Sequence, residues 1–352
     1  MLNDVDIITK IDKSGMIEVV ERFPDQIKET VDLVNSTEID KIFKIDNIII
    51  SGMGGSAISG DVIKSYLRDK FDIPIYINRE YDLPKWAKKN TLVFSQSYSG
   101  NTEETLSAFK HAYQKKCKII GISSGGKLQE YCEKRKLQHI KIPNGLAPRA
   151  AIAYLLFSCL LAMKKIGLLR NDIDLDIEES ITLTKEIRDN NKKTIPEEKN
   201  LSKQIARKIF NSTPQIYGFG IYAPIAKRWC NQFNENSKII AGYDVIPESN
   251  HNDIVGWSHD NEKSHNYSCI LFRDDKIETI YLSKRLEFMK ELLSEIVKNV
   301  IEIQVKGKKT LAKMLYFMYL GDFITCYLAI LKNIDPTPVN AIEELKNQLK
   351  KL

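Results

Sequence analysis

Short β-branched apolar runs alternate with segments of helical spacing through residues 45–143. The first segment, 45–67, reads as a strand, a glycine-rich turn and a helix, which is how a doubly wound unit begins. Further apolar runs follow at 71–78, 90–96, 117–124 and 139–143, and an amphipathic helix is expected before all of them, around 16–34. This alternation predicts a parallel sheet with crossover helices.

The second half of the chain repeats this layout. Segment 214–233 again gives a strand, a glycine turn and a helix, so that Gly218-Phe219-Gly220 corresponds to Gly52-Met53-Gly54. Later strands are predicted at 268–274, 279–283 and 301–305. We therefore predict an α/β fold with two doubly wound, mainly parallel five-stranded sheets flanked by helices.

A chain of 352 residues suits two domains. The predicted division is an opening helix with the first sheet over 1–167, a helical linker over 168–200, the second sheet over 201–334 and a C-terminal helix over 335–352. In that last helix Thr337 is expected to cap and Pro338 to occupy the first helical position. Its apolar stripe predicts that it docks on the rest of the protein, and the stripe consists of Val339, Ile342, Leu345 and Leu349.

Charge and composition narrow the functional classes. The formal charge of +6 arises from 52 basic and 46 acidic residues dispersed along the chain, without the basic arm or stripe that nucleic-acid binding usually needs. Six cysteines include no CxxC pair, and the first ten residues lack the apolar core of a signal peptide, so we expect a cytoplasmic protein with reduced thiols. The apolar runs 150–163 and 314–331 are expected to be buried helices rather than membrane spans, the first being too short and the second interrupted by Asp322.

Candidate chemistry lies where two predicted strands turn into helices. Ser97, Ser99 and Thr102 place neutral hydroxyl donors at a helix N-terminus, which is itself an anion site. No lysine follows in a GxxxxGK[ST] pattern, so a phosphate monoester fits better than a nucleoside triphosphate with Mg²⁺. Alternatively these are only capping residues, with Asn101 as N-cap and Glu104 completing a capping box.

The glycine turn at 52–55 strengthens the phosphate interpretation, because Ser56 and Ser59 supply further donors at a second strand end of the same sheet. Its GMGGSA segment also fits the loose dinucleotide pattern, with Glu80 near the distance of a ribose-binding acid. A dinucleotide-dependent enzyme is thus an alternative, although such a cofactor would leave the hydroxyl side chains of 97–102 without a function. No HxH or HExxH pattern and no ligand-spaced cluster is present, so no metal is predicted.

Five segments in this order, GMGGSAISGD, SYSGNTEET, GLAPRAA, NENSK and ESNHND, resemble the bifunctional phosphoglucose/phosphomannose isomerases, a family built from two sugar isomerase (SIS) domains. The resemblance spans nearly the whole chain. It implies a cofactor-free aldose-ketose isomerase that interconverts glucose 6-phosphate and mannose 6-phosphate with fructose 6-phosphate through an enediolate. It also implies a homodimer whose substrates are hexose 6-phosphates.

The resemblance further implies roles for individual residues. The phosphate and nearby hydroxyls would be held by Gly55, Ser56, Ser97, Ser99 and Thr102. Glu235 would be the base, Arg149 would stabilise the enediolate oxygen, and His251 would open the sugar ring in the partner's active site. A tail lysine completes the set, and the choice between Lys346 and Lys350 stays open because both border the apolar stripe.

Two simpler interpretations remain for these residues. On spacing alone Glu235 reads as an ordinary exposed helix-terminal carboxylate, and Arg149 could form a salt bridge with the linker acids. For the whole chain, the competing function is a non-catalytic regulator of the SIS type. Such a sensor needs the phosphate loops but no base.

Overall fold

The computed structural model describes residues 1–259 and 261–349. Contacts divide the chain into two compact units, which we name the N-terminal unit (Arg22–Thr184 with Gly307–Met314) and the C-terminal unit (Met1–Glu21, Lys185–Lys306 and Leu315–Leu352). This division is not the one drawn from the sequence, and the domain boundaries at 167, 200 and 334 stay predictions. Each unit contains one parallel sheet with helices on both faces, which confirms the predicted fold class.

The N-terminal unit is built on a five-stranded parallel sheet in the order β2-β1-β3-β4-β5. The strands are β1 (Asn47–Ser51), β2 (Ile75–Asn78), β3 (Thr91–Gln96), β4 (Lys118–Ser123) and β5 (Gln138–Lys141). The helices are α3 (Phe23–Ser36), α4 (Gly54–Tyr66), α5 (Glu103–Gln114), α6 (Gly126–Lys134) and α7 (Ile152–Lys165), with the 3₁₀ turn η1 (Pro148–Ala151) before α7. The opening helix predicted around 16–34 is in fact two helices, and Pro24 lies in the first turn of the second one, α3.

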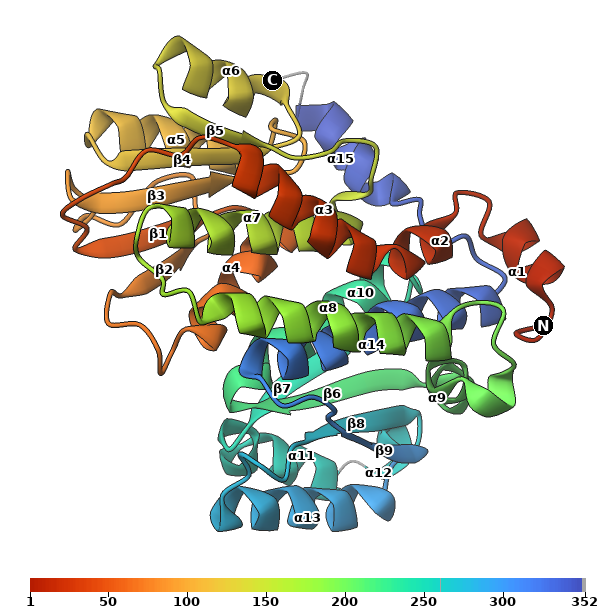
Figure 1. Ribbon diagram of the computed structural model, residues 1–352. Coiled ribbons are helices and arrows are strands. Elements are labelled where there is room, and N and C mark those ends of the chain that lie inside the picture. Colours follow the sequence, from red (N-terminus) through yellow and green to blue (C-terminus); the bar gives the residue numbers. More distant parts are fainter. Residues whose placement is uncertain (260, 350–352) are drawn as a thin grey trace. The chain divides into compact units, whose positions relative to one another are not determined.

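Alternate side chains of these strands point to opposite faces, as the pleat requires. Ile49 and Val93 pack on Phe109 of α5 and Leu128 of α6. The other face lies against α4, where a Cβ on Gly60 would come within 2.9 Å of Ile50. Helix α3 packs on α7 (Figure 1). The layers therefore leave the carboxyl ends of the strands free to carry loops.

The C-terminal unit is built on a four-stranded parallel sheet in the order β7-β6-β8-β9. The strands are β6 (Thr213–Phe219), β7 (Gly242–Ile246), β8 (Tyr267–Arg273) and β9 (Asn299–Gln304). The helical elements are α1 (Val5–Ile11), α2 (Met16–Glu21), η2 (Glu197–Lys199), α9 (Leu201–Ile209), η3 (Gly220–Tyr222), α10 (Ala223–Glu235), η4 (Glu248–His251), α11 (Asp253–His259), α12 (Asn261–Ser264), α13 (Ile280–Ser294) and α15 (Asn340–Leu349).

Two predictions for the second sheet were wrong, and one strand was overlooked. It has four strands in the described structure rather than five, because the chain passes from β9 directly toward α14 (Thr310–Leu331), without counterparts of α6 and β5. Residues 279–283 are not a strand, since Thr279 caps α13 by accepting a hydrogen bond from Leu282 N. The strand β7 was missed.

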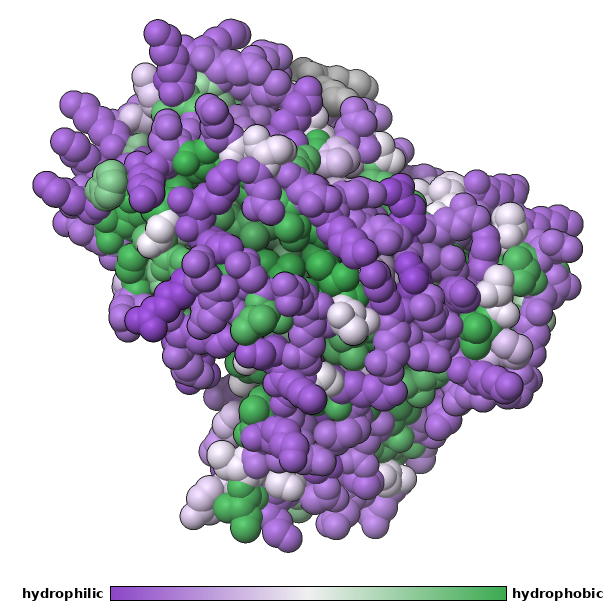
Figure 2. Space-filling model, in the orientation of Figure 1, coloured by the Kyte–Doolittle hydropathy of each residue, from purple (hydrophilic) through white to green (hydrophobic). Residues whose placement is uncertain are grey.

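Two long helices connect or extend the units. Helix α8 (Ile173–Asn191) lies in the predicted helical linker and buries Ile173, Ile177, Leu183 and Ile187. Helix α14 is the one helix in the described residues that is long and apolar enough to cross a bilayer. Its apolar 18-residue stretch is entirely buried in the structure. Hydrophilic residues cover most of the face seen in Figure 2, and hydrophobic residues emerge there as separate patches.

The C-terminal helix does not dock as predicted. It begins at Asn340, two residues after Pro338, and the side chains of its stripe remain exposed, with Ile342, Leu345 and Leu349 between 41% and 56% accessible. Every residue from Ala341 to Leu349 is exposed, so the apolar stripe of this helix was not sufficient to make it pack on the rest of the protein.

A buried lysine holds the C-terminal unit's outlying segments together. Lys203 is fully buried, and its ammonium donates to the carbonyl oxygens of Leu2 (2.6 Å), Lys193 (2.8 Å) and Ile195 (2.7 Å). Burial lowers the pKa of Lys203 to about 8. The charged ammonium is thus needed for three hydrogen bonds while its desolvation opposes the charge.

This pKa predicts a pH dependence of stability. Between pH 8 and 10.5 the folded chain has lost the Lys203 proton while the unfolded chain keeps it, so unfolding takes up a proton and the free energy of unfolding should rise with pH. Each unit of difference between the two pKa values corresponds to about 1.4 kcal/mol. Denaturant titrations across this window should show the rise in the wild type and in the surface control Lys199→Met, but not in Lys203→Met. Equal slopes in all three would contradict the assignment.

Candidate active site

Two loops of the N-terminal unit meet at the carboxyl edge of its sheet. Strands β1 and β3 are parallel neighbours, with Ser51 beside Ser95, so the loops that follow them start side by side. The closeness requires glycine at position 52, where a Cβ would lie 2.8 Å from the Gln96 carbonyl oxygen and 2.9 Å from the Ser56 Cβ. The glycine turn and the hydroxyl loop therefore form one surface.

The hydroxyl loop, residues 97–102, is held by its own hydroxyls. Ser97 Oγ and Thr102 Oγ1 share a hydrogen bond of 2.8 Å, and Thr102 N donates to Ser97 Oγ at 3.3 Å. Ser97 is buried whereas Ser99 is exposed. The capping alternative was wrong, because Thr102 is the N-cap of α5 and makes no side-chain cap bond. Asn101 instead accepts a hydrogen bond from Lys127 N of α6.

A second glycine turn, after β4, supports the hydroxyl loop. Gly100 has φ +68°, and a Cβ there would lie 1.7 Å from the Gly125 carbonyl oxygen, so only glycine fits. Ser124 donates through both its N–H and its Oγ to the Tyr98 carbonyl oxygen (2.9 and 2.7 Å). The sequence reasoning assigned no role to this turn, although its ISSGGK segment has the same strand-to-glycine signature as the other two.

The same loop positions the segment that carries Arg149. Tyr98 Oη accepts a hydrogen bond of 2.9 Å from Leu146 N. A Cβ on Gly55 would lie 3.1 Å from the Pro148 carbonyl oxygen and 3.4 Å from the Arg149 Cα. Arg149 is 3% exposed at η1, so the N-terminal unit places the backbone of a buried arginine against the glycine turn. Within this unit Gly55, Ser56, Ser97, Thr102 and Arg149 belong to one group of interlocked loops.

The histidines of this unit are structural. Burial lowers the pKa of His139 to about 4, and its Nε2 shares a hydrogen bond with Ser123 Oγ, so the ring is neutral near pH 7. His111 Nδ1 accepts a hydrogen bond from Leu83 N. His139 is therefore not suited to acid-base chemistry at neutral pH.

Glu235 is the last residue of α10 in the C-terminal unit, as predicted. It lines a cavity of about 540 Å³ formed by the end of α10 and the start of the C-terminal tail. The other lining residues are Asn234, Lys238, Ile334, Asp335, Pro338, Val339, Asn340, Ala341 and Ile342. A half-buried glutamate that lines a cavity differs from the ordinary surface glutamate of the simpler interpretation.

The end of α10 is fixed by buried polar contacts with α14. Arg228 Nη2 donates to both carboxylate oxygens of Asp322 (3.0 and 2.8 Å), and Gln232 Nε2 donates to the same carboxylate at 2.8 Å. Next to Glu235, Asn236 Nδ2 donates to Thr325 Oγ1 and Ser237 Oγ donates to the Thr325 carbonyl oxygen. Asp322, a single acid within an apolar run, was the sequence signal for this anchor.

The remaining predicted residues are more exposed. His251 is accessible in turn η4 and is not among the residues that line the Glu235 cavity. Lys346 is exposed on α15, one turn after the cavity residue Ile342, and Lys350 lies outside the described residues. Within 1–259 and 261–349, no group of three or more His, Cys, Asp or Glu side chains is arranged to hold a metal ion.

Comparison with known proteins agrees with this architecture. The family model of the bacterial phospho-glucose isomerase C-terminal SIS domain matches residues 198–349. A solved structure of a glucose-6-phosphate isomerase like protein from Thermus thermophilus superposes with a TM-score of 0.66 at 16% identity, over 97% of this chain and 99% of that one. At that identity the likeness concerns the fold alone.

Curated relatives are much closer in sequence. A bifunctional phosphoglucose/phosphomannose isomerase of Caldicellulosiruptor bescii is 40% identical over 336 residues, which cover 95% of this chain and 98% of that protein. Another protein of the same description, from Aquifex aeolicus, is 34% identical over 86% of this chain and 90% of its own length. The chain therefore belongs to the family of bifunctional phosphoglucose/phosphomannose isomerases.

Proposed function

We propose that this protein interconverts glucose 6-phosphate and mannose 6-phosphate with fructose 6-phosphate. The observation that carries the proposal is the lysine-free hydroxyl loop 97–102, locked beside the glycine turn and the buried Arg149. Its neutral donors at a helix N-terminus suit a phosphate monoester. The descriptions of the curated relatives supply the hexose and the isomerisation.

In this proposal the N-terminal unit holds the phosphate through Gly55, Ser56, Ser97, Ser99 and Thr102. Arg149 stabilises the negative oxygen of the enediolate by a charge-assisted hydrogen bond, a role that suits a guanidinium with almost no solvent exposure.

Glu235 is the proposed base. Its carboxylate removes the proton from C2 of the aldose, and the electron pair of that C–H bond forms the C1–C2 double bond of the enediolate while O1 takes the negative charge. The proton returns to C1 and the proton of the O2 hydroxyl passes to O1, which gives the ketose. The cavity at the end of α10 supports the assignment, because it gives the carboxylate room for a substrate. His251 of the partner subunit opens the sugar ring, and Lys346 or Lys350 adds a cation.

The activity can be tested by proton NMR of the chelator-treated protein with fructose 6-phosphate in D₂O. We expect glucose 6-phosphate and mannose 6-phosphate to appear together, both deuterated at C2, because the base exchanges its proton with solvent. Glucose 6-phosphate alone would restrict the activity to one epimer. Binding of fructose 6-phosphate with no product would instead favour a regulator that senses sugar phosphates.

Glu235→Gln should abolish turnover without abolishing binding. Loss of a general base is expected to lower kcat by about 10²-fold or more, while the amide keeps the shape of the side chain. Isomerase assays and calorimetric titration with fructose 6-phosphate measure the two effects separately. Glu291→Gln, an exposed carboxylate on α13, is the matched control and should behave as wild type. Near-normal turnover in Glu235→Gln would rule out its assignment as the base.

The shared site predicts complementation between two inactive variants. In a heterodimer of Glu235→Gln and His251→Ala chains, one site carries both changes and the other carries neither. An equal mixture that exchanges subunits freely should therefore regain about a quarter of wild-type activity. Mass spectrometry of differently tagged chains verifies the exchange. No recovery despite exchange, or a fully active monomer in light scattering, would refute the contribution of His251 across the dimer.

A further inference from the structure

The two units carry a loop of the same length at the same place in their sheets. In the N-terminal unit, residues 97–102 connect β3 to α5, and in the C-terminal unit residues 274–279 connect β8 to α13. Each preceding strand is paired with the first strand of its unit, and each loop ends in a threonine N-cap, Thr102 or Thr279. The loops can therefore be compared position by position.

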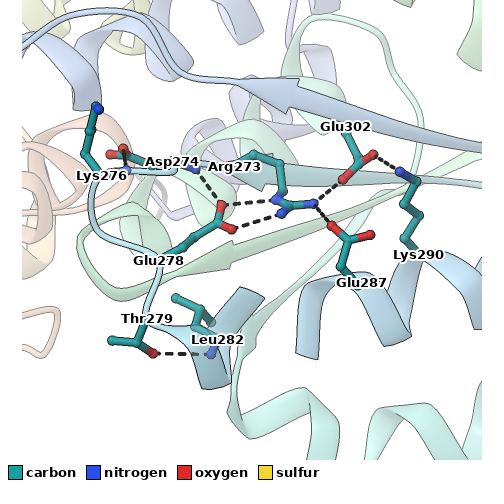
Figure 3. Close-up of polar contacts among 9 residues, drawn as sticks. All are labelled: Arg273, Asp274, Lys276, Glu278, Thr279, Leu282, Glu287, Lys290 and Glu302. Atoms are coloured by element: carbon teal, nitrogen blue, oxygen red, sulfur yellow. Dashed lines mark hydrogen bonds and ion pairs between the residues drawn. The ribbon is translucent and has the colours of Figure 1, made fainter. Parts of the chain in front are cut away.

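Their residues differ in charge. The first loop reads SYSGNT and has no charged residue, whereas the second reads DDKIET and has four. Glu278, which corresponds to Asn101, folds its carboxylate back over the strand end (Figure 3). There Oε1 accepts hydrogen bonds from Asp274 N (2.7 Å) and Arg273 Nε (3.0 Å), and Oε2 accepts one from Arg273 Nη2 (3.0 Å).

The first amide after each strand shows the difference most directly. Ser97 N continues the sheet by donating to the Ile122 carbonyl oxygen at 3.1 Å. The corresponding Asp274 N donates to the Glu278 carboxylate instead. Asp274 itself accepts from Lys276 N (3.0 Å) and from Tyr222 Oη (2.5 Å). The amide after β8 is thus bonded to a loop carboxylate, whereas the amide after β3 remains part of the sheet.

The arrangement is nearly closed to solvent. The Glu278 side chain is 4% exposed and that of Arg273 is 13% exposed. Arg273 Nη1 also bonds Glu287 (2.7 Å) and Glu302, and Lys290 neutralises Glu302 from α13 (2.6 Å). A buried carboxylate with two guanidinium bonds and one backbone amide has the donor set of a bound oxyanion.

We propose that Glu278 is an internal carboxylate that fills the anion position of the C-terminal unit, so that each chain holds a single phosphate group, on the hydroxyl loop of the N-terminal unit. The inference rests on the phosphate-binding role proposed above for loop 97–102. On this proposal the loop of the N-terminal unit takes its anion from solution, whereas in the C-terminal unit the chain supplies the anion itself.

Amide NMR of the perdeuterated full chain, titrated with inorganic phosphate, tests the inference. In the wild type we expect the amide signals of 97–102 to move and those of 274–279 to stay. Glu278→Asn, which installs the residue found at position 101, should make the amides of 274–279 respond, with affinity for phosphate raised about tenfold or more over the wild-type loop. The control Glu287→Asn also removes a carboxylate from Arg273, but it leaves the hydrogen bond from Asp274 N to Glu278 in place. Its 274–279 amide signals should therefore stay unchanged, as in the wild type.

The outcomes separate this inference from the proposed function. A shift of the 274–279 amide signals in the wild type would overturn the proposal that Glu278 fills the anion position. Unchanged 274–279 signals in folded Glu278→Asn would overturn it as well, and Glu278→Ala replaces that variant if it does not fold. Unchanged amide signals of 97–102 in the wild type would instead refute the phosphate-binding role of that loop, whatever the result for the Glu278 variants.

Discussion

The hydroxyl loop depends on one backbone contact, the approach of Gly100 to Gly125. The carbonyl oxygen of Gly125 occupies the space of a Cβ at position 100, and the left-handed φ of Gly100 turns the chain so that Thr102 can begin α5. Through this contact the loop after β4 fixes Tyr98, and Tyr98 in turn holds Leu146 next to Arg149. A chain of glycine contacts and hydrogen bonds therefore sets the donor geometry before any anion binds, so little conformational entropy has to be lost on binding.

The C-terminal unit solves the same geometric problem with charge. Its strand end is stabilised by Arg273 and three carboxylates, where the N-terminal unit uses glycine contacts and hydroxyls. Charged groups bring their own counter-ions into the loop and leave no donor set for a ligand, whereas neutral donors remain available. On the two proposals above, the same sheet architecture can bind an anion or supply one, and the loop after the strand and the charged residues that contact it decide which.

Hydrophobic periodicity predicted the first sheet well, because its three central strands β1, β3 and β4 are apolar runs buried on both faces. It failed where an apolar run was not buried. Ile280 and Tyr281 look like a strand but lie 72% and 80% exposed on α13, and Thr279 caps that helix. Strand β7 escaped notice because the sequence GYDVI is only partly buried at the edge of its sheet.

The candidate site divides in the same way. Local signals indicated the glycine and hydroxyl loops and the helix end at Glu235, since these depend on residues near in sequence. The residues that support these loops and this helix end could not be assigned from local signals, because the partners are distant in the chain. Ser124 is 26 residues from Tyr98, and Asp322 is 94 residues from Arg228. Such pairs are fixed by the topology of the sheet and by helix packing, which a pattern of polar positions does not specify.

The lysine-free loop also fits the energetics of the proposed reaction. Aldose and ketose phosphates carry the same phosphate group, far from C1 and C2, so contacts with it stabilise substrate, enediolate and product alike. Such uniform binding sets KM and leaves kcat unchanged, and a stronger cationic cradle would only slow product release. Rate enhancement must then come from groups that respond to the charge developing at C1 and C2. A buried guanidinium and a carboxylate beside a cavity are groups of that kind, which is why the chemistry is assigned to Arg149 and Glu235 rather than to the hydroxyls.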